Sequence, residues 1–436
     1  MLDILCCKIT IGDADSSNPM KINNPITLTE VGSIEISESY KQLIGTATIM
    51  FPKGTVFKST IIGNATIEGA DASSITTEIM EDGVIIEKRT TTQAMNETSF
   101  SVGQRVNIQL GYNGVLKNLF FGYITAYNSE SQFEIKCENM AYKLKLKQAP
   151  KFETSTTCSV NDILGEKYNL LENTGFAIHT DTKQYDIKIG KVKITDNFTV
   201  ADILNEWSKY KLYCFLKYDE NNTDSMPAIA IGRPYSSSKS QPIFPQDSEA
   251  TPFKIKFDYH VASSDLKAIK VDPKFLAITG KALGKDEKFF EATVRLNPDY
   301  DSSVSGSKEF QTVNATQVTK KSQKVTGNKT AEGAETKTQV DLSTYTVMPY
   351  MSPNIGIDSD TLVEEAIEYF KNYNLNGIEG SLTIFGDLAL ATACQVELID
   401  TRNPSKNGTY IVEEVTTSFG VNGYRQKVST PYKIKS

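Results

Sequence analysis

The chain has 436 residues, of which 39% are hydrophobic and 23% charged, and carries a formal net charge of −7. This length accommodates two to four domains with their own cores, and the composition is that of a folded globular protein. The acidic balance argues against specific nucleic-acid binding, and no run of about eighteen apolar residues is present that could insert into a membrane.

Residues 1–150 are rich in strand patterns and predict a first β-barrel domain. A strand is expected from Leu2 to Ile11, and the segments 33–37 and 46–52 alternate apolar and polar residues. Residues 61–100 are expected to form an insertion, with a hairpin turning at Asp82 and Gly83.

Three further strand patterns complete this first part, at residues 102–112, 120–125 and 133–138. The lysines that follow occupy every second position. They favour a solvated strand face over a phosphate-binding site. These lysines are Lys143, Lys145 and Lys147.

Residues 151–250 contain an internal repeat and predict an intermediate α+β domain with two helix–strand units. The segment 159–166 recurs as 199–206, and Ser159 or Thr199 precedes an acidic residue at the third following position. That spacing predicts a reciprocal helix cap. Extended stretches follow at 176–178 and 212–216, and 228–232 is expected to pair with the second of them in a hairpin.

Residues 251–436 predict a second β-barrel domain. The segment 302–344 is poor in apolar residues and is expected to be a flexible insertion, because it cannot bury enough surface to offset its ordering entropy. A helix is expected over 361–375, with a capping box that begins at Thr361.

The two ends of the chain carry the same kind of strand cluster. Strand patterns at 395–400, 408–415 and 423–429 repeat the arrangement at 102–138, with an alternating strand, a Gly-containing turn, a strand led by Gly or aromatic residues, and a final alternating strand. We therefore expect a mainly β fold with an α+β insert, in which two small antiparallel β-barrels flank the intermediate domain. Three such chains can form a ring of six similar units.

The sequence offers no credible active site, so we expect no enzyme and no catalytic, cofactor-binding or metal-binding residues. The two histidines, His179 and His260, lie in no catalytic motif, and the short Gly/Lys run at 280–285 is expected to be a turn. Six cysteines without a Cys-x-x-Cys pair predict neither a zinc site nor disulfides, and indicate buried thiols in a reducing cytoplasm. Two groups of acidic residues are interpreted as ordinary surface charge: Glu364, Glu365 and Glu368, and Asp219, Glu220 and Asp224.

The order of these parts resembles the tail hub proteins of phage baseplates, of the late-control-D type, which are related to the base of the VgrG spike in contractile injection systems. The segment 36–52 is similar to the opening strand pair of that family, and 120–124 is similar to its F-x-G-x-I hairpin. The helix starts at Ser159 and Thr199 resemble its intermediate domain, and residues 386–432 resemble its closing barrel.

The resemblance implies a homotrimeric ring that adapts a six-fold tail tube to a three-fold spike and lets cargo pass. The implied partners are the tail tube protein, a separate spike protein and other baseplate or tail-tip proteins. The implied location is the virion tail, assembled in the cytoplasm of the bacterial host. Neither insertion has a counterpart in the family. The spike and any lysin are expected to be separate polypeptides, since no spike or wall-degrading domain follows Tyr432.

Two other functions stay open from the sequence. The 20 tyrosines and 20 phenylalanines could stack on sugars in a carbohydrate-binding surface protein or receptor-binding module, although aromatic residues mostly fill cores. A glycan array distinguishes this possibility. The other is a tail-associated cell-wall hydrolase, which the clearing of cell-wall substrate would reveal.

Overall fold

The structure is a computed structural model. It describes residues 4–15, 18, 20–52, 58–59, 65–67, 75–81, 84–91, 100–128, 133–155, 158–184, 187–190, 192–210, 212–218, 225–232, 252–268, 273–283, 289–300, 303–304, 308–313, 342–352, 357–372, 378–430 and 432–435.

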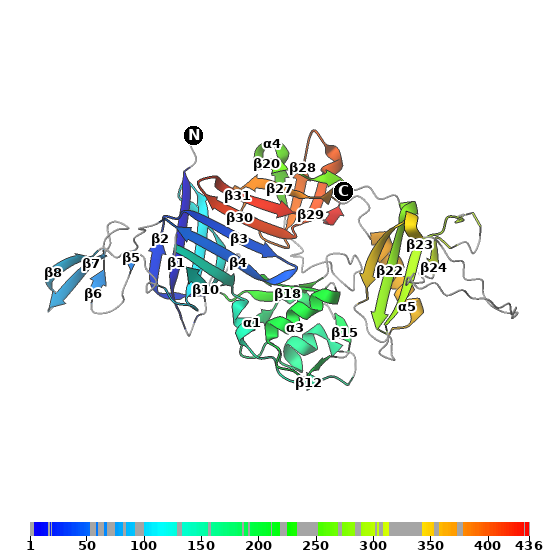
Figure 1. The fold of residues 1–436 in the computed structure, drawn as a ribbon, viewed down its shortest axis with the longest axis horizontal. Helices are drawn as coiled ribbons and strands as arrows, with labels where there is room; N and C mark the ends of the chain where they lie inside the picture. Colours follow the sequence, from blue (N-terminus) through cyan, green and yellow to red (C-terminus); the bar gives the residue numbers. More distant parts are fainter. Residues whose placement is uncertain are drawn as a thin grey trace.

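Twelve strands from both ends of the chain form one antiparallel sheet (Figure 1). Its order is β20 (Val261–Ser264), β27 (Ser381–Phe385), β31 (Gly423–Ser429), β30 (Glu414–Gly420), β3 (Ser33–Ser39), β4 (Gln42–Phe51), β11 (Phe133–Asn139), β10 (Val115–Asn128), β9 (Arg105–Tyr112), β1 (Leu5–Ala14), β2 (Ile22–Leu28) and β5 (Lys58–Ser59). A second sheet joins β19 (Phe253–Lys256), β28 (Gln395–Ile399), β29 (Gly408–Ile411) and β32 (Tyr432–Lys435).

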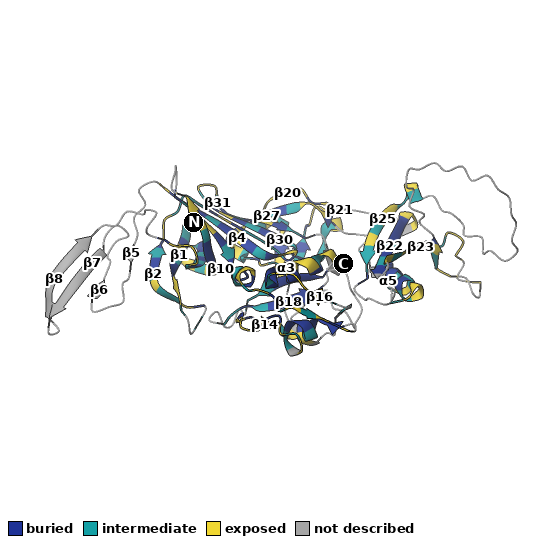
Figure 2. Ribbon diagram, turned by 60° about the horizontal axis from the view of Figure 1, so that its bottom comes forward, coloured by how far each residue is buried: buried dark blue, intermediate teal, exposed yellow. Residues whose placement is uncertain are grey.

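The alternation in the sequence becomes one buried and one accessible face of these strands. In β4, every second residue is buried, and Ile49 packs with Ile34 of β3 and Ile135 of β11 in one core. Figure 2 shows this buried face along the strands. The first strand begins at Leu5 and runs to Ala14, three residues later than expected, because its register with β9 starts at the pair Leu5 and Tyr112.

We call β1–β4 and β9–β11 the first module, and β19, β20 and β27–β32 the second module. The mainly β class with an α+β insert is confirmed. Among the described strands, however, the pairing closes no ring. Instead, the two modules share the twelve-stranded sheet through the pair β3 and β30.

The intermediate part confirms the repeated cap and corrects one helix. Thr199 and Asp202 form a complete capping box at the start of α3 (Val200–Glu206). Ser159 and Asp162 make the same two reciprocal bonds, but a single π-turn follows (Asp162–Glu166), in which the amides of two later residues both reach the Asp162 carbonyl. Gly165 within this turn disfavours a regular helix.

The strands after the two repeats flank the same partner. β14 (Ala177–Ile178) runs parallel to β18 (Ala228–Gly232), and β17 (Tyr213–Lys217) pairs with β18 in the predicted antiparallel manner. The remaining short elements are α1 (Tyr142–Leu146), β12 (Phe152–Glu153), β13 (Cys158–Ser159), α2 (Thr180–Gln184), β15 (Lys188–Gly190) and β16 (Lys193–Ile194). The lysines 143–147 therefore lie on and just after a short helix, and the predicted strand face is wrong.

A third sheet lies within the predicted second barrel domain. It consists of β24 (Phe310–Val313), β23 (Phe289–Leu296), β22 (Leu276–Leu283) and β25 (Thr346–Met351), and α5 (Ser359–Asn372) packs on it. Residues 280–283 thus belong to a strand, and the predicted turn is wrong there. The expected flexible insertion 302–344 is also partly wrong, since Phe310–Val313 pairs with β23; residues 314–341 lie outside the described part.

The helix α5 starts two residues before the predicted one. Asp358 caps it, because its carboxylate accepts bonds from both the amide and the hydroxyl of Thr361. The hairpin predicted in the first insertion is confirmed as the antiparallel pair β7 (Ile75–Glu81) and β8 (Val84–Thr91), although its turn residues 82 and 83 lie outside the described part. The strand β6 (Ala65–Ile67) pairs with the other edge of β7. Three short elements lie next to the second module along the chain. The strands β21 (Lys267–Ala268) and β26 (Ile378–Glu379) pair with each other, and the helix α4 (Phe257–His260) precedes β20.

Candidate interface between the end modules

The pair β3 and β30 joins the two modules along seven residues, from Ser33 opposite Gly420 to Ser39 opposite Glu414. Side chains follow the same contact. Phe419 and Tyr424 of the second module belong to the buried core of the first, together with Ile34 and Ile36. Separating the modules would expose this shared apolar core to water, so both backbone pairing and burial stabilise the junction.

A polar clamp closes one end of the junction. The Tyr40 amide donates to the carbonyl of Glu413 (3.1 Å), and its hydroxyl donates to the carboxylate of the same residue (3.3 Å). Lys41 adds an ion pair to that carboxylate at 2.7 Å. The Tyr40 side chain is 0% exposed, and its ring lies 5.5 Å from that of Tyr213 in the intermediate part. Tyr40 therefore links the first module to both the second module and the intermediate part.

The hairpin between β9 and β10 holds the other end. It turns through Asn113 (φ 52°) and Gly114 (φ 83°), the left-handed pair that a two-residue hairpin needs. The Tyr112 hydroxyl donates to the Tyr424 carbonyl at 2.9 Å, with the two rings 5.4 Å apart. The Lys117 ammonium donates to the carbonyl of Asp387 at 2.7 Å.

A small pocket remains at this second contact. Its lining is Leu110, Gly111, Tyr112, Val115, Lys117, Gly386, Asp387 and Tyr424. Tyr112 and Lys117 both make bonds across it, and the Tyr424 ring lies so close to Gly386 that a Cβ there would be 2.3 Å from a ring carbon. The pocket is thus residual space within a module contact.

A buried guanidinium lies where the sheet meets the intermediate part. Arg105 is 1% exposed, and its charge lies 4.7 Å from the centre of the Tyr123 ring. Its terminal nitrogens point to the sulfur atoms of Met140 and Met20. The cation–π contact and the polarisable thioethers compensate part of the desolvation of this charge.

Glu38 at the end of β3 is a second ionisable group, and it is partly buried. Glycine at position 45 makes room for it, because a Cβ there would lie 2.9 Å from Cγ of Glu38. Burial raises the pKa of Glu38 from 4.5 to about 7. Burial also raises the pKa of Tyr218, and the nearby Glu38 charge raises it further.

The raised pKa of Glu38 predicts a pH dependence of stability. The folded protein binds more protons than the unfolded chain between pH 4.5 and 7, so the free energy of unfolding falls as the pH rises through this range. Glu38→Gln should remove this slope and raise the free energy of unfolding at pH 8 by about 2 kcal/mol, because a neutral amide replaces a partly buried carboxylate. Urea unfolding at pH 5 and pH 8 measures both effects. If the variant were destabilised equally at the two pH values, Glu38 would not be the group whose raised pKa causes the pH dependence.

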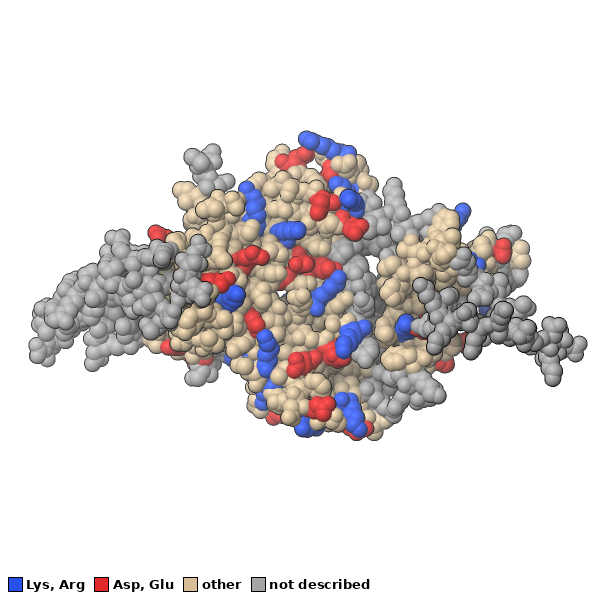
Figure 3. All heavy atoms as spheres, in the orientation of Figure 1, with Lys and Arg blue, Asp and Glu red and all other residues tan. Residues whose placement is uncertain are grey.

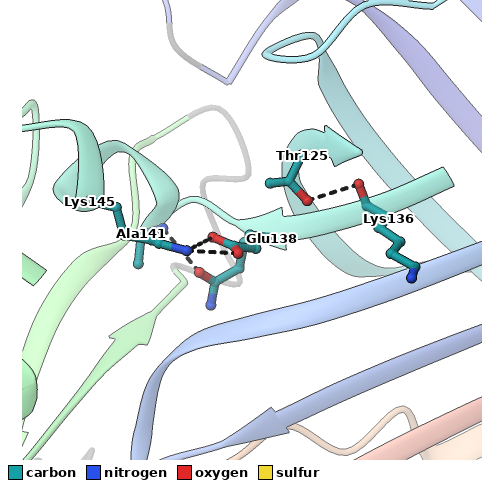
Figure 4. A network of polar contacts seen from close by, with 6 residues as sticks. Thr125, Lys136, Glu138, Ala141 and Lys145 are labelled. Carbon is teal, nitrogen blue, oxygen red and sulfur yellow. Dashed lines mark hydrogen bonds and ion pairs between the residues drawn. The ribbon is translucent and has the colours of Figure 1, made fainter. Parts of the chain in front are cut away.

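A polar network links the end of β11 to α1 (Figure 4). Both carboxylate oxygens of Glu138 accept bonds from the Lys145 ammonium at 2.9 Å, and the side chain of Asn139 accepts the Ala141 amide at 3.1 Å. On the adjoining strand, the Thr125 hydroxyl donates to the Lys136 carbonyl at 3.2 Å. The network fixes the turn from the sheet into α1.

We expect the Glu138–Lys145 pair to contribute little to stability. The Lys145 side chain is 44% exposed, so water screens the attraction, and Lys145→Ala should lower the free energy of unfolding by less than about 1 kcal/mol. A double-mutant cycle with Glu138→Gln in urea unfolding measures the coupling. A coupling well above that size would mean that the pair is buried in the working assembly.

The histidines and acidic residues considered for catalysis or metal binding do not lie together in the described part of the chain. The His179 amide donates to the Ile229 carbonyl, the His260 ring accepts the Lys256 amide at 3.0 Å, and the Glu365 carboxylate accepts the Tyr350 hydroxyl at 3.1 Å. The acidic residues 219–224 lie outside the described part. None of the six cysteines forms a disulfide, and four of them are buried.

Within the described residues, no group of three or more His, Cys, Asp or Glu side chains could hold a metal ion. No helix there is long and apolar enough to cross a membrane. On the face that Figure 3 shows, basic and acidic side chains are interspersed over both modules and the intermediate part. The contacts between the modules are therefore the candidate functional feature of the described residues.

No protein-family model and no curated protein matched the sequence. Several solved structures align with nearly the whole chain. The 43 kDa tail protein of prophage MuSo2 from Shewanella oneidensis has 11% identity and a TM-score of 0.48, over 97% of this chain and 98% of that one. A tail protein from Neisseria meningitidis MC58 has 7% identity and a TM-score of 0.49, over 98% of this chain and 96% of that one.

A chain of the half-lidded Francisella PdpA–VgrG complex has 11% identity and a TM-score of 0.48, over 98% of this chain and 58% of that one. The structures named here are thus a prophage tail protein, a second tail protein and a chain of a PdpA–VgrG complex.

Proposed function

We propose that this chain is the structural hub of a phage tail or of a related injection device. In this proposal, three copies form a ring between a six-fold tail tube and a three-fold spike, and cargo passes through its centre. The partners are the tail tube protein, a separate spike protein and other baseplate or tail-tip proteins, and the location is the virion tail. The role is structural, without turnover of a substrate.

The observation that carries the proposal is the junction between like modules. The strands β4, β11 and β10 of the first module pair in the same order as β27, β31 and β30 of the second, and β3 joins the two modules side by side in one sheet. Two similar units per chain turn three-fold symmetry into six near-equivalent positions. Heterologous contacts between copies close into such a ring without free ends.

The oligomeric mass tests the proposal. Native mass spectrometry or light scattering of the purified chain should give three times 48.2 kDa, about 145 kDa. A stable monomer or a two-fold dimer over the accessible concentration range would contradict it. In a second arm, purified tail tube protein of the same phage should assemble into tubes that start from the ring, whereas a mixture without the ring should show a lag.

A further inference from the structure

The two modules differ at one edge. In the second module, one edge of β30 pairs with β31 and the other edge is covered by β3 along seven residues. Its counterpart in the first module is the second half of β10, which pairs with β11 in the same antiparallel manner. The corresponding outer edge of β10 has a different environment.

The strand β9 covers only the first half of β10. Their pairing ends at Tyr123 opposite Arg105, and the last backbone bonds on that side join Ile124 to Gly103 and Gln104. Beyond that point, Ala126 and Tyr127 pair only with β11 in the described part of the chain, and Thr125 lies at a bulge in that ladder. Ala126 is exposed, and Tyr127 is 38% exposed. This edge presents backbone groups without a strand partner.

The counterpart of β3 in the second module is the strand piece β20, continued by β21. Just as β3 pairs with β4, β20 pairs with β27, and β21 extends the same ladder through β26. The strand β20 is the last strand at its end of the twelve-stranded sheet. Three of its residues, at positions 262–264, are exposed. It too offers an open edge within the described residues.

We propose that these two edges pair with each other between copies of the chain. The Thr125–Tyr127 edge of β10 in one subunit accepts the β20–β21 edge of the next subunit as an antiparallel strand, in the way that β30 accepts β3 within one chain. Each chain carries one edge of each kind, so three such contacts close a ring whose internal and intermolecular junctions have the same strand arrangement. The inference rests on the trimer proposed above and specifies its interface.

Cysteine cross-linking tests the pairing directly, because side chains opposite each other in an antiparallel pair have Cβ atoms about 5 Å apart, within disulfide reach. One cysteine replaces Ala126 or Tyr127, and a second replaces the residue at 262, 263 or 264, to cover the alternative registers. Under mild oxidation, at least one double variant, such as A126C with S263C, should shift from one to three chains on a denaturing gel.

Three controls make the result specific. The single variants and the unsubstituted chain, with its six native cysteines, should stay at one chain, and so should Ala126→Cys combined with Asp196→Cys, at an exposed position of the intermediate part. A 145 kDa trimer in which none of the six double variants cross-links overturns the proposed interface and leaves the hub function standing. A chain that is monomeric before oxidation instead contradicts the hub function itself.

Discussion

Replacing Tyr40 by alanine should lower the free energy of unfolding by about 4 kcal/mol, the largest effect that we expect from a single side chain. Its ring is fully buried among Tyr213, Phe215 and Ile411, which come from the intermediate part and the second module. Truncation would leave a cavity at the place where all three parts of the protein meet. Urea unfolding followed by circular dichroism measures the loss.

The matched control is Tyr40→Phe, which keeps the ring and removes only the hydroxyl bond to Glu413. This variant should lose about 1.5 kcal/mol, the lower end of the usual contribution of a hydrogen bond to a charged partner, because the bond is long at 3.3 Å. Both variants should unfold in one transition if the parts are coupled through this residue. A loss below 2 kcal/mol for the alanine variant, or early melting of one part alone, would show that Tyr40 does not join them.

Gly122→Ala should lower the free energy of unfolding by about 3 kcal/mol or more. A Cβ at this position would lie 2.1 Å from the Glu138 carbonyl oxygen and 2.7 Å from Cε1 of Phe120. The oxygen belongs to the backbone of the paired strand β11, so relief requires the strands to move apart. This contact gives a physical reason for the glycine in the F-x-G-x-I pattern at 120–124.

Gly165→Ala is the control for this prediction, because its Cβ would meet only Cδ1 of Ile178 at 3.5 Å, an ordinary contact. Alanine also restricts the unfolded chain, so this variant should equal or slightly exceed the parent in stability. Similar midpoints in urea for the two alanine variants would refute the steric argument at Gly122.

Features set by neighbouring residues were predicted well from the sequence. Strand alternation, the reciprocal bonds at Ser159 and Thr199 and the hairpin of β7 and β8 depend on residues a few positions apart. The failures are cases where distant contacts decide the structure. The lysines 143–147 follow strand spacing, but burial of Leu144 in a core shared with Val160 and Leu204 sets a short helix there.

The shared sheet and its clamp left no local signal to predict. Tyr40 and Glu413 are 373 positions apart, and neither belongs to a motif whose chemistry identifies its partner. Similarly, β24 lies in a polar stretch and becomes a strand because β23 offers it an edge. The sequence indicated the shared sheet only indirectly. The two ends of the chain have similar strand patterns, and this similarity favours an association of like modules.

Electron cryomicroscopy of the purified oligomer, viewed along its symmetry axis, tests the central claim most directly. We expect a closed three-fold ring in which the two modules of each chain alternate, so that the ring layer has a strong six-fold component around a central opening. Density with three separate pairs of modules, two-fold symmetry or a particle without an opening would contradict the account.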